Sequence, residues 1–358
     1  MNLPIFKTKI EEINRKFNLN DPNERREYFL AKAGPEIEKL KNYLKNNTFV
    51  GYLLGKKNSG KGTYSKLFME AVGPEHISHI SIGDIVRDVH RAYESGKGRE
   101  ELTAFLEKSF RGFHGLDEIE NIILGRGTTT LISSELIVAL IKYELSKRQK
   151  RAIFIDGFPR ALDQVTYSLF LKELIGYRDD PDFFVFIDVP EAVIDERMRT
   201  RVVCPKCNTP RSTRLAPTSE IDYDEAAKTA YLLCDNPECG KPRMVAKEGD
   251  ELGIEKIRER LELDDKIFRQ LLELKGVPQV LLRNSVPVDK AKEYVDDYEI
   301  TPAYEYEYDA ASKKVKIIGK QWVVKDDDGV ESYSLLPSPV AVSLIKQTAK
   351  VLGLQIRI

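Results

Sequence analysis

The chain has 358 residues, of which 42% are hydrophobic, and this length predicts a main domain with inserts or appendages. Charged residues make up 32%, but their signs nearly cancel to a formal net charge of -1, which argues against a nucleic-acid partner bound by electrostatics. The chain has no apolar run of about 18 residues, and it starts with a charged segment that does not resemble a signal peptide. We therefore expect a cytoplasmic protein with no membrane partner.

Residues 1–47 are polar and predict an N-terminal helical extension packed on the main domain. Asp21, Pro22 and Glu24 are typical of an N-cap, a first helical position and a capping-box acid. Apolar residues then recur at helical spacing up to Leu44, with an interruption near Gly34.

From residue 48 the pattern alternates between strands and helices. Nearly all-apolar runs at 49–54, 151–157 and 182–189, and a further run at 76–81, predict strands of a parallel sheet that is covered on both faces. Helical patterns follow at 63–72, 85–93 and 131–148. This order predicts an open α/β sheet, whose ligands bind at the carboxyl ends of the strands.

Three stretches depart from this alternation. Residues 88–130 predict a helical insert, and residues 202–250 contain the cysteines and many turn formers. The tail, 296–358, alternates like hairpin strands with a turn at Asp328-Gly329, and then closes with an amphipathic helix. The last strand and helix of the core are expected either within 283–295 or within 334–346.

The segment GKKNSGKGT, Gly55 to Thr63, lies between a predicted strand and a predicted helix and nearly matches a phosphate-binding loop. Its backbone N–H groups would form an anion cradle, to which Lys61 adds a positive charge. Lys56 and Lys57 add two more charges, which either tighten nucleotide binding or face solvent.

Acidic and basic residues follow other strands and helices. Asp156 ends a strand where a metal-bound phosphate would lie, and Arg160 offers a fork of donors to a phosphate; alternatively, Asp156 caps a helix and Arg160 makes a surface ion pair. Arg197 and Arg201 stand four apart and are predicted on one helical face. Arg258 and Arg260 stand two apart, so at most one of them faces a site.

The four cysteines form the pattern Cys-x2-Cys, 26 residues, Cys-x4-Cys, at Cys204, Cys207, Cys234 and Cys239. Paired spacing of this kind predicts a structural zinc site with four thiolate ligands, and four unrelated cysteines are the alternative. The histidines show no ligand spacing and are expected to be ordinary residues: His76, His79, His90 and His114.

Together these motifs resemble the adenylate kinase family of nucleoside monophosphate kinases, from about residue 49 to residue 263. The resemblance is carried by the Gly-x4-Gly-Lys-Gly-Thr loop, by Gly83-Asp84-x-x-Arg87, by Leu131–Glu135, by Asp156–Arg160 with Gln164, and by the arginines around a cysteine-bearing lid. It implies an α/β P-loop kinase, with an open parallel five-stranded sheet flanked by helices, a helical insert that binds the nucleoside monophosphate (NMP), and a zinc-ribbon-like lid insert.

The resemblance and the changes of pattern divide the chain into seven segments. They are an N-terminal helical extension, 1–47; a core segment with the phosphate loop, 48–82; an NMP-binding insert, 83–131; a core segment, 132–201; a zinc-binding lid, 202–252; a core segment, 253–295; and a C-terminal β-hairpin and helix, 296–358, one candidate location of the last core strand.

The resemblance implies reversible, Mg²⁺-dependent phosphoryl transfer from ATP to AMP, giving two ADP. The residues implied for ATP are Gly55, Asn58, Ser59, Gly60, Lys61, Gly62, Thr63, Arg197 and Arg201. Those implied for AMP are Ser81, Ile82, Arg87, Ile132, Gly157, Arg160, Gln164 and Arg260. Those implied for catalysis are Lys61, Asp156, Arg160, Arg197, Arg201 and Arg260, with Asp156 and Asp84 as candidates to hold Mg²⁺ through its water shell.

The sequence is compatible with other functions. Ile82 stands where the family often has threonine, so a kinase for CMP, UMP or several acceptors is an alternative, although Gln164 favours AMP. A P-loop ATPase that uses its zinc ribbon and extensions to bind nucleic acid or protein is a second alternative, against which the acceptor motif counts. Lys247 and Asp250-Glu251 are candidates to replace the family's lid arginine and acidic pair. Oligomerisation through the extensions is a separate hypothesis.

Overall fold

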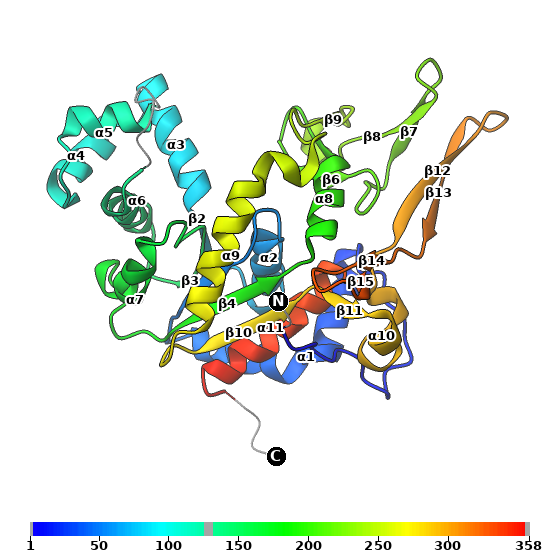
Figure 1. Cartoon of the computed structure of the whole chain (residues 1–358), viewed down its shortest axis with the longest axis horizontal. Helices are drawn as coiled ribbons and strands as arrows, with labels where there is room; N and C mark the ends of the chain where they lie inside the picture. The colour runs from blue at the N-terminus through cyan, green and yellow to red at the C-terminus, as the bar shows by residue number, and fades with distance from the viewer. Residues whose placement is uncertain (1–2, 125–131, 355–358) are drawn as a thin grey trace.

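The central element of the protein is a five-stranded parallel sheet, seen in a computed structural model that describes residues 3–124 and 132–354 (Figure 1). Its strands are ordered β10-β4-β1-β3-β2, and each neighbouring pair is parallel. They span Val50–Leu54 (β1), Ile77–Ser81 (β2), Ala152–Asp156 (β3), Asp182–Asp188 (β4) and Gln279–Arg283 (β10). The predicted α/β fold with an open five-stranded parallel sheet is confirmed.

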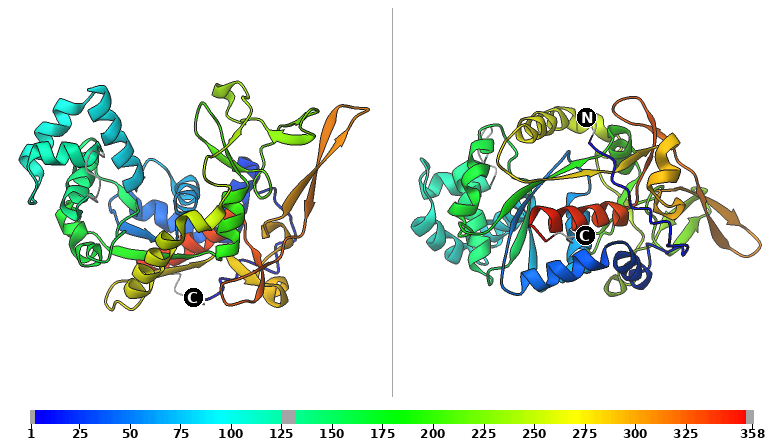
Figure 2. Two further views of the ribbon diagram at one scale, coloured as in Figure 1. Left: turned by 45° about the horizontal axis from the view of Figure 1, so that its top comes forward. Right: turned by 90° about the horizontal axis from the view of Figure 1, so that it is seen from below.

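Alternate side chains of each strand pack into two hydrophobic layers, one on each face of the sheet. In β4, Phe183, Val185 and Ile187 join one layer, whereas Phe184 and Phe186 join the other. This is the two-residue period of a strand, and it explains why these runs are apolar throughout. Helices cover both faces, as the right-hand view of Figure 2 illustrates.

The helices of the core follow the predicted alternation. They are α2 (Lys61–Val72), α3 (Ile82–Ser95), α6 (Ser134–Ser146), α7 (Gln164–Leu174), α8 (Glu191–Arg199) and α9 (Arg258–Leu272). A closing helix, α11 (Pro337–Val351), packs against β10 and α2. The last strand of the sheet, β10, ends at Arg283, where the first of the two predicted stretches begins. The closing helix α11 begins inside the second stretch, 334–346, and continues to Val351.

The N-terminal extension contains one kinked helix, α1 (Pro22–Leu44), which packs on α2 and α11. Asp21 caps it as predicted, but the carboxylate of Glu24 accepts from the N–H of Asn18, so the predicted capping box does not close on Asp21. The kink lies at Ala33, where φ is -147°, directly before the predicted interruption.

Two inserts rise from the carboxyl side of the sheet (Figure 1). The first continues from α3 into α4 (Arg99–Ser109) and α5 (Leu116–Ile123), and its described residues form helices and no strand. The second contains short strands: β5 (Arg201–Val203), β6 (Pro210–Ser212), β7 (Ile221–Asp224), β8 (Thr229–Leu232) and β9 (Val245–Ala246). Short 3₁₀ helices lie at Pro237–Cys239 and Gly253–Ile257. Leu131 of the predicted family segment lies outside the described residues.

The tail forms two antiparallel pairs where one hairpin was predicted. It begins with β11 (Ser285–Pro287), α10 (Val288–Tyr294) and a 3₁₀ turn at Asp297–Glu299. β12 (Ala303–Asp309) pairs with β13 (Lys314–Lys320), and β14 (Val324–Lys325) pairs with β15 (Glu331–Ser334). The predicted Asp328-Gly329 turn joins the second pair, with Gly329 at φ +80°. β15 also pairs with β11, which brings the tail back beside β10.

No helix in the described parts of the chain is both long enough and apolar enough to span a bilayer.

Candidate active site

A cavity of about 290 Å³ opens at the carboxyl ends of β1, β2 and β3, the edge where the sequence predicted a ligand. Its walls come from the phosphate loop, the start of α3, the turn after β3 and one face of α9. The lining residues are Leu53, Leu54, Gly55, Lys57, Asn58, Lys61, Ser81, Gly83, Arg87, Asp156, Gly157, Pro159, Arg160, Arg260, Asp264, Ile267 and Phe268.

The phosphate loop owes its shape to residues with positive φ. Gly60 has φ +95° directly before α2, and Gly55 has φ +153°. A Cβ on Gly55 would lie 2.6 Å from the carbonyl oxygen of Ile187, so no side chain fits there. The loop therefore ends at the amino end of α2, where free N–H groups and the helix dipole favour an anion.

Lys61 lies inside this loop. Its Nζ donates to the carbonyl oxygens of Gly55 (2.9 Å) and Lys56 (3.1 Å) and lies 3.9 Å from Asp156 Oδ1. Burial lowers the pKa of Lys61, and the nearby Asp156 carboxylate opposes that shift. The lysine that was predicted for the donor phosphates thus lines the cavity, close to the aspartate that was predicted to face a metal-bound phosphate.

Positive charge exceeds negative charge among the cavity residues. Five cationic side chains line it, Lys57, Lys61, Arg87, Arg160 and Arg260, against the carboxylates of Asp156 and Asp264. Arg260 pairs with Asp264 at 2.6 Å and donates to the Arg160 carbonyl oxygen at 3.0 Å. Burial lowers the pKa of Arg160, and repulsion from Arg260 adds to the shift. Such a surplus fits a ligand with several negative charges, such as a polyphosphate.

Arg197 and Arg201 do not share a helix, contrary to the prediction. α8 ends at Arg199, and Arg201 starts β5. Both nonetheless reach Asn58 in the loop: Arg197 Nη1 lies 3.5 Å from its carbonyl oxygen, and Arg201 Nη1 lies 3.2 Å from its Oδ1. Arg201 also forms a bidentate pair with Asp250. Neither arginine lines the cavity.

The residues predicted for the acceptor divide into two groups. Ser81, Arg87, Gly157, Arg160 and Arg260 line the cavity, and so does Gly83 of the family motif. Three others do not: Ile82 and Gln164 are buried, and Ile132 packs against the hydrophobic layer that contains Ile82. The Oε1 of Gln164 accepts from the Arg160 N–H at 2.8 Å, so this side chain supports the arginine turn. Arg258 points away and pairs with Glu191 and Glu255, as its spacing from Arg260 predicted.

The remaining predicted loop residues do not line the cavity. They are Ser59, Gly60, Gly62 and Thr63, of which Ser59 is fully buried. Asp84 pairs with Arg87 on the exposed face of α3. Asp264 was missed by the sequence reasoning, although it stands four residues after Arg260 on α9, the spacing of an intrahelical ion pair. It also accepts from the Lys57 N–H at 3.0 Å.

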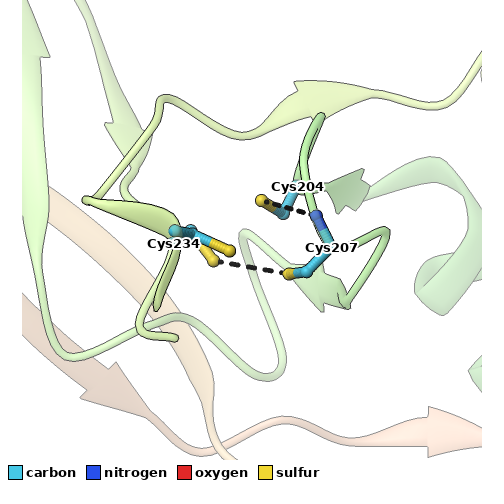
Figure 3. Close-up of side chains that lie close together, drawn as sticks. Cys204, Cys207 and Cys234 are labelled. Carbon is cyan, nitrogen blue, oxygen red and sulfur yellow. Dashed lines mark hydrogen bonds between the residues drawn. The ribbon is translucent and has the colours of Figure 1, made fainter. Parts of the chain in front are cut away.

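The four cysteines gather in the second insert, as Figure 3 shows for Cys204, Cys207 and Cys234. Their four Sγ atoms, including that of Cys239, all lie within 4.8 Å of one another. The N–H groups of Lys206 and Cys207 point at Cys204 Sγ, at 3.4 and 3.5 Å. Four converging thiols, one of which accepts from two N–H groups, fit a tetrahedral structural zinc, with no position left for water.

Comparison with known proteins agrees with this site. No family model matches the chain. It is 32% identical to an adenylate kinase of Thermotoga petrophila over 200 residues, which are 55% of this chain and 73% of that protein. It is 31% identical to an adenylate kinase of Clostridium acetobutylicum, over 60% of this chain and 80% of the relative. It is 30% identical to an adenylate kinase of Clostridium novyi, over 62% of this chain and 83% of the relative. The chain belongs to the adenylate kinase family and is a nucleoside monophosphate kinase.

Proposed function

We propose that this protein is an adenylate kinase that transfers a phosphoryl group reversibly from MgATP to AMP, giving two ADP. The observation that carries the proposal is the cavity itself, where the phosphate loop faces the Asp156–Arg160 turn across a surplus of cations. In-line transfer between two anionic nucleotides needs both held in position and their charge neutralised, with water excluded.

On the donor side, the loop amides and Lys61 would hold the β- and γ-phosphates, and Mg²⁺ would arrive with ATP. Asp156 would hold that ion through its water shell, since Mg²⁺ keeps several waters in protein sites. We assign the donor set as Gly55, Asn58, Ser59, Gly60, Lys61, Gly62, Thr63, Arg197 and Arg201. The contacts of both arginines with Asn58 support this set, because they join α8 and the start of β5 to the loop.

On the acceptor side, Arg87 and Arg160 would hold the α-phosphate of AMP. The full set is Ser81, Ile82, Arg87, Ile132, Gly157, Arg160, Gln164 and Arg260. Ile82, Ile132 and Gln164 do not line the cavity, so their contact with the base would need the cavity to open toward them. Arg197, Arg201 and Arg260 would then surround the transferred phosphoryl group.

We further assign the insert at 83–131 to AMP binding and the insert at 202–252 to a lid over ATP. The cysteine cluster would hold zinc and keep the short lid strands together. Closing both inserts would expel water and so favour transfer to AMP over hydrolysis.

The direct test is ADP formation from MgATP with AMP, CMP, UMP, GMP or no acceptor. We expect the highest rate with AMP and almost none without an acceptor. A higher rate with CMP or UMP would move the assignment to another acceptor, and turnover without acceptor but not with AMP would refute kinase function.

A further inference from the structure

The ribbon formed by β12 and β13 lies along the outer side of the lid insert. In Figure 1 it runs beside β7 and β8, on the side away from α3, α4 and α5, and Figure 2 shows the same neighbours from a second direction. β13 also contacts β7 directly. A segment from the C-terminal tail therefore covers the back of the lid.

The two faces of this ribbon differ in chemistry. Tyr304, Tyr306 and Tyr308 share one face, opposite Gly319, Ile317 and Val315 of β13. The other face carries charged residues, including the ion pair of Glu305 with Lys320. Because an isolated two-stranded ribbon is only marginally stable in water, the aromatic face needs a partner.

That partner is the lid. The Tyr308 ring stacks on Tyr223 of β7, with ring centroids 4.0 Å apart and planes within 5°. The Tyr308 hydroxyl donates to Glu225 at 3.1 Å. The Tyr306 hydroxyl donates to the carbonyl oxygen of Thr213.

Two further contacts join the ribbon to the lid. The Tyr306 side chain packs against the hydrophobic cluster that contains the zinc-site cysteines. The Tyr304 N–H donates to the Arg214 carbonyl oxygen at 2.7 Å. The contacts thus extend from the first tyrosine of the ribbon to the last.

The base of the ribbon is fixed in the core. Ala303, Trp322 and Val324 are buried in the same hydrophobic layer as α1, α2 and α11. The lid has its own two connections to the core, and the ribbon adds a third from a separate part of the chain. In this arrangement no described residue of 202–252 lines the cavity.

We infer that the ribbon is a docking arm for the lid, and that Tyr223, Tyr306 and Tyr308 are positioning residues that hold the lid away from the cavity between turnovers. The inference rests on the proposed role of the lid in ATP binding. For the lid to reach the cavity, these contacts must break or the ribbon must bend. MgATP must supply that free energy from its own binding, so the docking contacts raise the KM for MgATP and favour reopening.

The test is steady-state kinetics of Tyr308→Ala and Tyr223→Ala. An aromatic stack is strong enough to shift such an equilibrium by up to about tenfold. We expect the KM for MgATP to fall by about two- to tenfold while the KM for AMP changes by less than twofold. Glu307→Gln, on the charged face of the same ribbon, is the matched control and should leave both values unchanged. Tyr308→Phe, which keeps the stack, should give a smaller effect.

A second readout does not depend on activity. In the free protein, Tyr308→Ala should speed amide hydrogen exchange in lid residues 213–232, whereas Glu307→Gln should not; equal zinc content in all variants would exclude loss of the metal site. An unchanged or raised KM for MgATP, or unchanged lid exchange, would overturn the docking role. Absence of any turnover with AMP in the wild-type protein would instead refute the proposed function and leave the exchange experiment to decide the docking.

Discussion

At the scale of single residues, two neighbouring lysines of the phosphate loop have different surroundings. Lys56 pairs with Asp327 at 2.7 Å and with Glu191 at 3.1 Å. Lys57 lines the cavity, and in the described part of the chain no carboxylate lies within ion-pair distance of its Nζ. Burial lowers the pKa of Lys57, and the positive charges of Lys247 and Arg201 lower it further.

A bound polyphosphate would relieve this repulsion around Lys57. We predict that Lys57→Gln raises the KM for MgATP by about three- to tenfold, the loss expected for one charge-assisted hydrogen bond at a partly exposed site. The KM for AMP should change much less, and Lys57→Arg should restore most of the affinity. A Lys57→Gln variant with wild-type kinetics would mean that the Lys57 side chain faces solvent and does not contribute to MgATP binding.

Asp188, at the end of β4, gives a prediction about pH. Burial raises the pKa of its carboxyl to about 6, and the nearby charge of Asp327 adds to the shift. In the unfolded chain the pKa of an aspartate is about 3.9. At pH values between the two pKa values, the folded protein therefore binds the Asp188 proton more strongly than the unfolded chain does. Stability contributed by this group is therefore greatest at low pH and is lost as the pH rises through about 4 to 6.

Asp188→Asn removes this ionisation. The variant should be more stable than wild type at pH 8, by roughly 1–3 kcal/mol, and the difference should shrink at pH 5. Urea denaturation at both pH values measures it. The same difference at both pH values would show that the side chain acts through packing and not through its charge.

The site residues that the sequence could identify are those in short motifs with a fixed local geometry. Lys61 follows a glycine loop at a helix start, and Asp156 and Arg160 follow a strand end, so neighbours in sequence are neighbours in the cavity. Arg201 was assigned to a helix because a four-residue spacing resembles one, whereas the chain leaves α8 before it. Its contact with Asn58 spans 143 residues, and such a contact depends on tertiary packing.

At the scale of elements, the turn between β14 and β15 supports the phosphate loop. Besides its pair with Lys56, Asp327 accepts from the N–H of Glu191 at the start of α8, at 2.7 Å. One side chain of the C-terminal extension thus connects the loop and the helix that carries Arg197. The extension is therefore in contact with the donor side of the site.

We predict that Asp327→Asn loosens this connection. The KM for MgATP should rise by about two- to fivefold and the free energy of unfolding should fall by about 1 kcal/mol, the size of a partly buried charged hydrogen bond. Glu331→Gln, an exposed change on β15, is the control. Unchanged kinetics and stability in Asp327→Asn would show that the C-terminal extension does not support the phosphate loop through this side chain.

The helices and strands that the sequence predicted well are those whose apolar residues recur at a regular spacing or form a continuous run. The three nearly all-apolar runs became β1, β3 and β4, because a strand covered on both faces needs apolar residues throughout. The run at 76–81 became β2, in which Ile77 and Ile80 are buried. β10 was not recognised as the fifth strand. It is an edge strand with Gln279 and Arg283 at its ends and only Val280 and Leu282 fully buried, so its signal is weaker. The tail was predicted as hairpin strands, but its pairing with β11 is set by tertiary contacts.

At the scale of the whole molecule, the cysteine cluster connects the lid with the tail through Tyr306. We predict about one equivalent of zinc in protein purified without chelators. Removing it should destabilise the lid, because four close thiols lose the ion that holds them. Cys239→Ser should lose the metal, lower the melting temperature and raise the KM for MgATP more than the KM for AMP. Metal-free protein from such a purification would contradict the zinc assignment.

Phosphoryl transfer between two adenine nucleotides in one cavity can be measured in the reverse direction, from ADP alone. Purified protein is incubated with MgADP alone, and the nucleotides are separated over time. We predict that ATP and AMP appear in equal amounts until equilibrium, since each transfer makes one of each. AMP or phosphate without ATP, or no reaction at all, would contradict it.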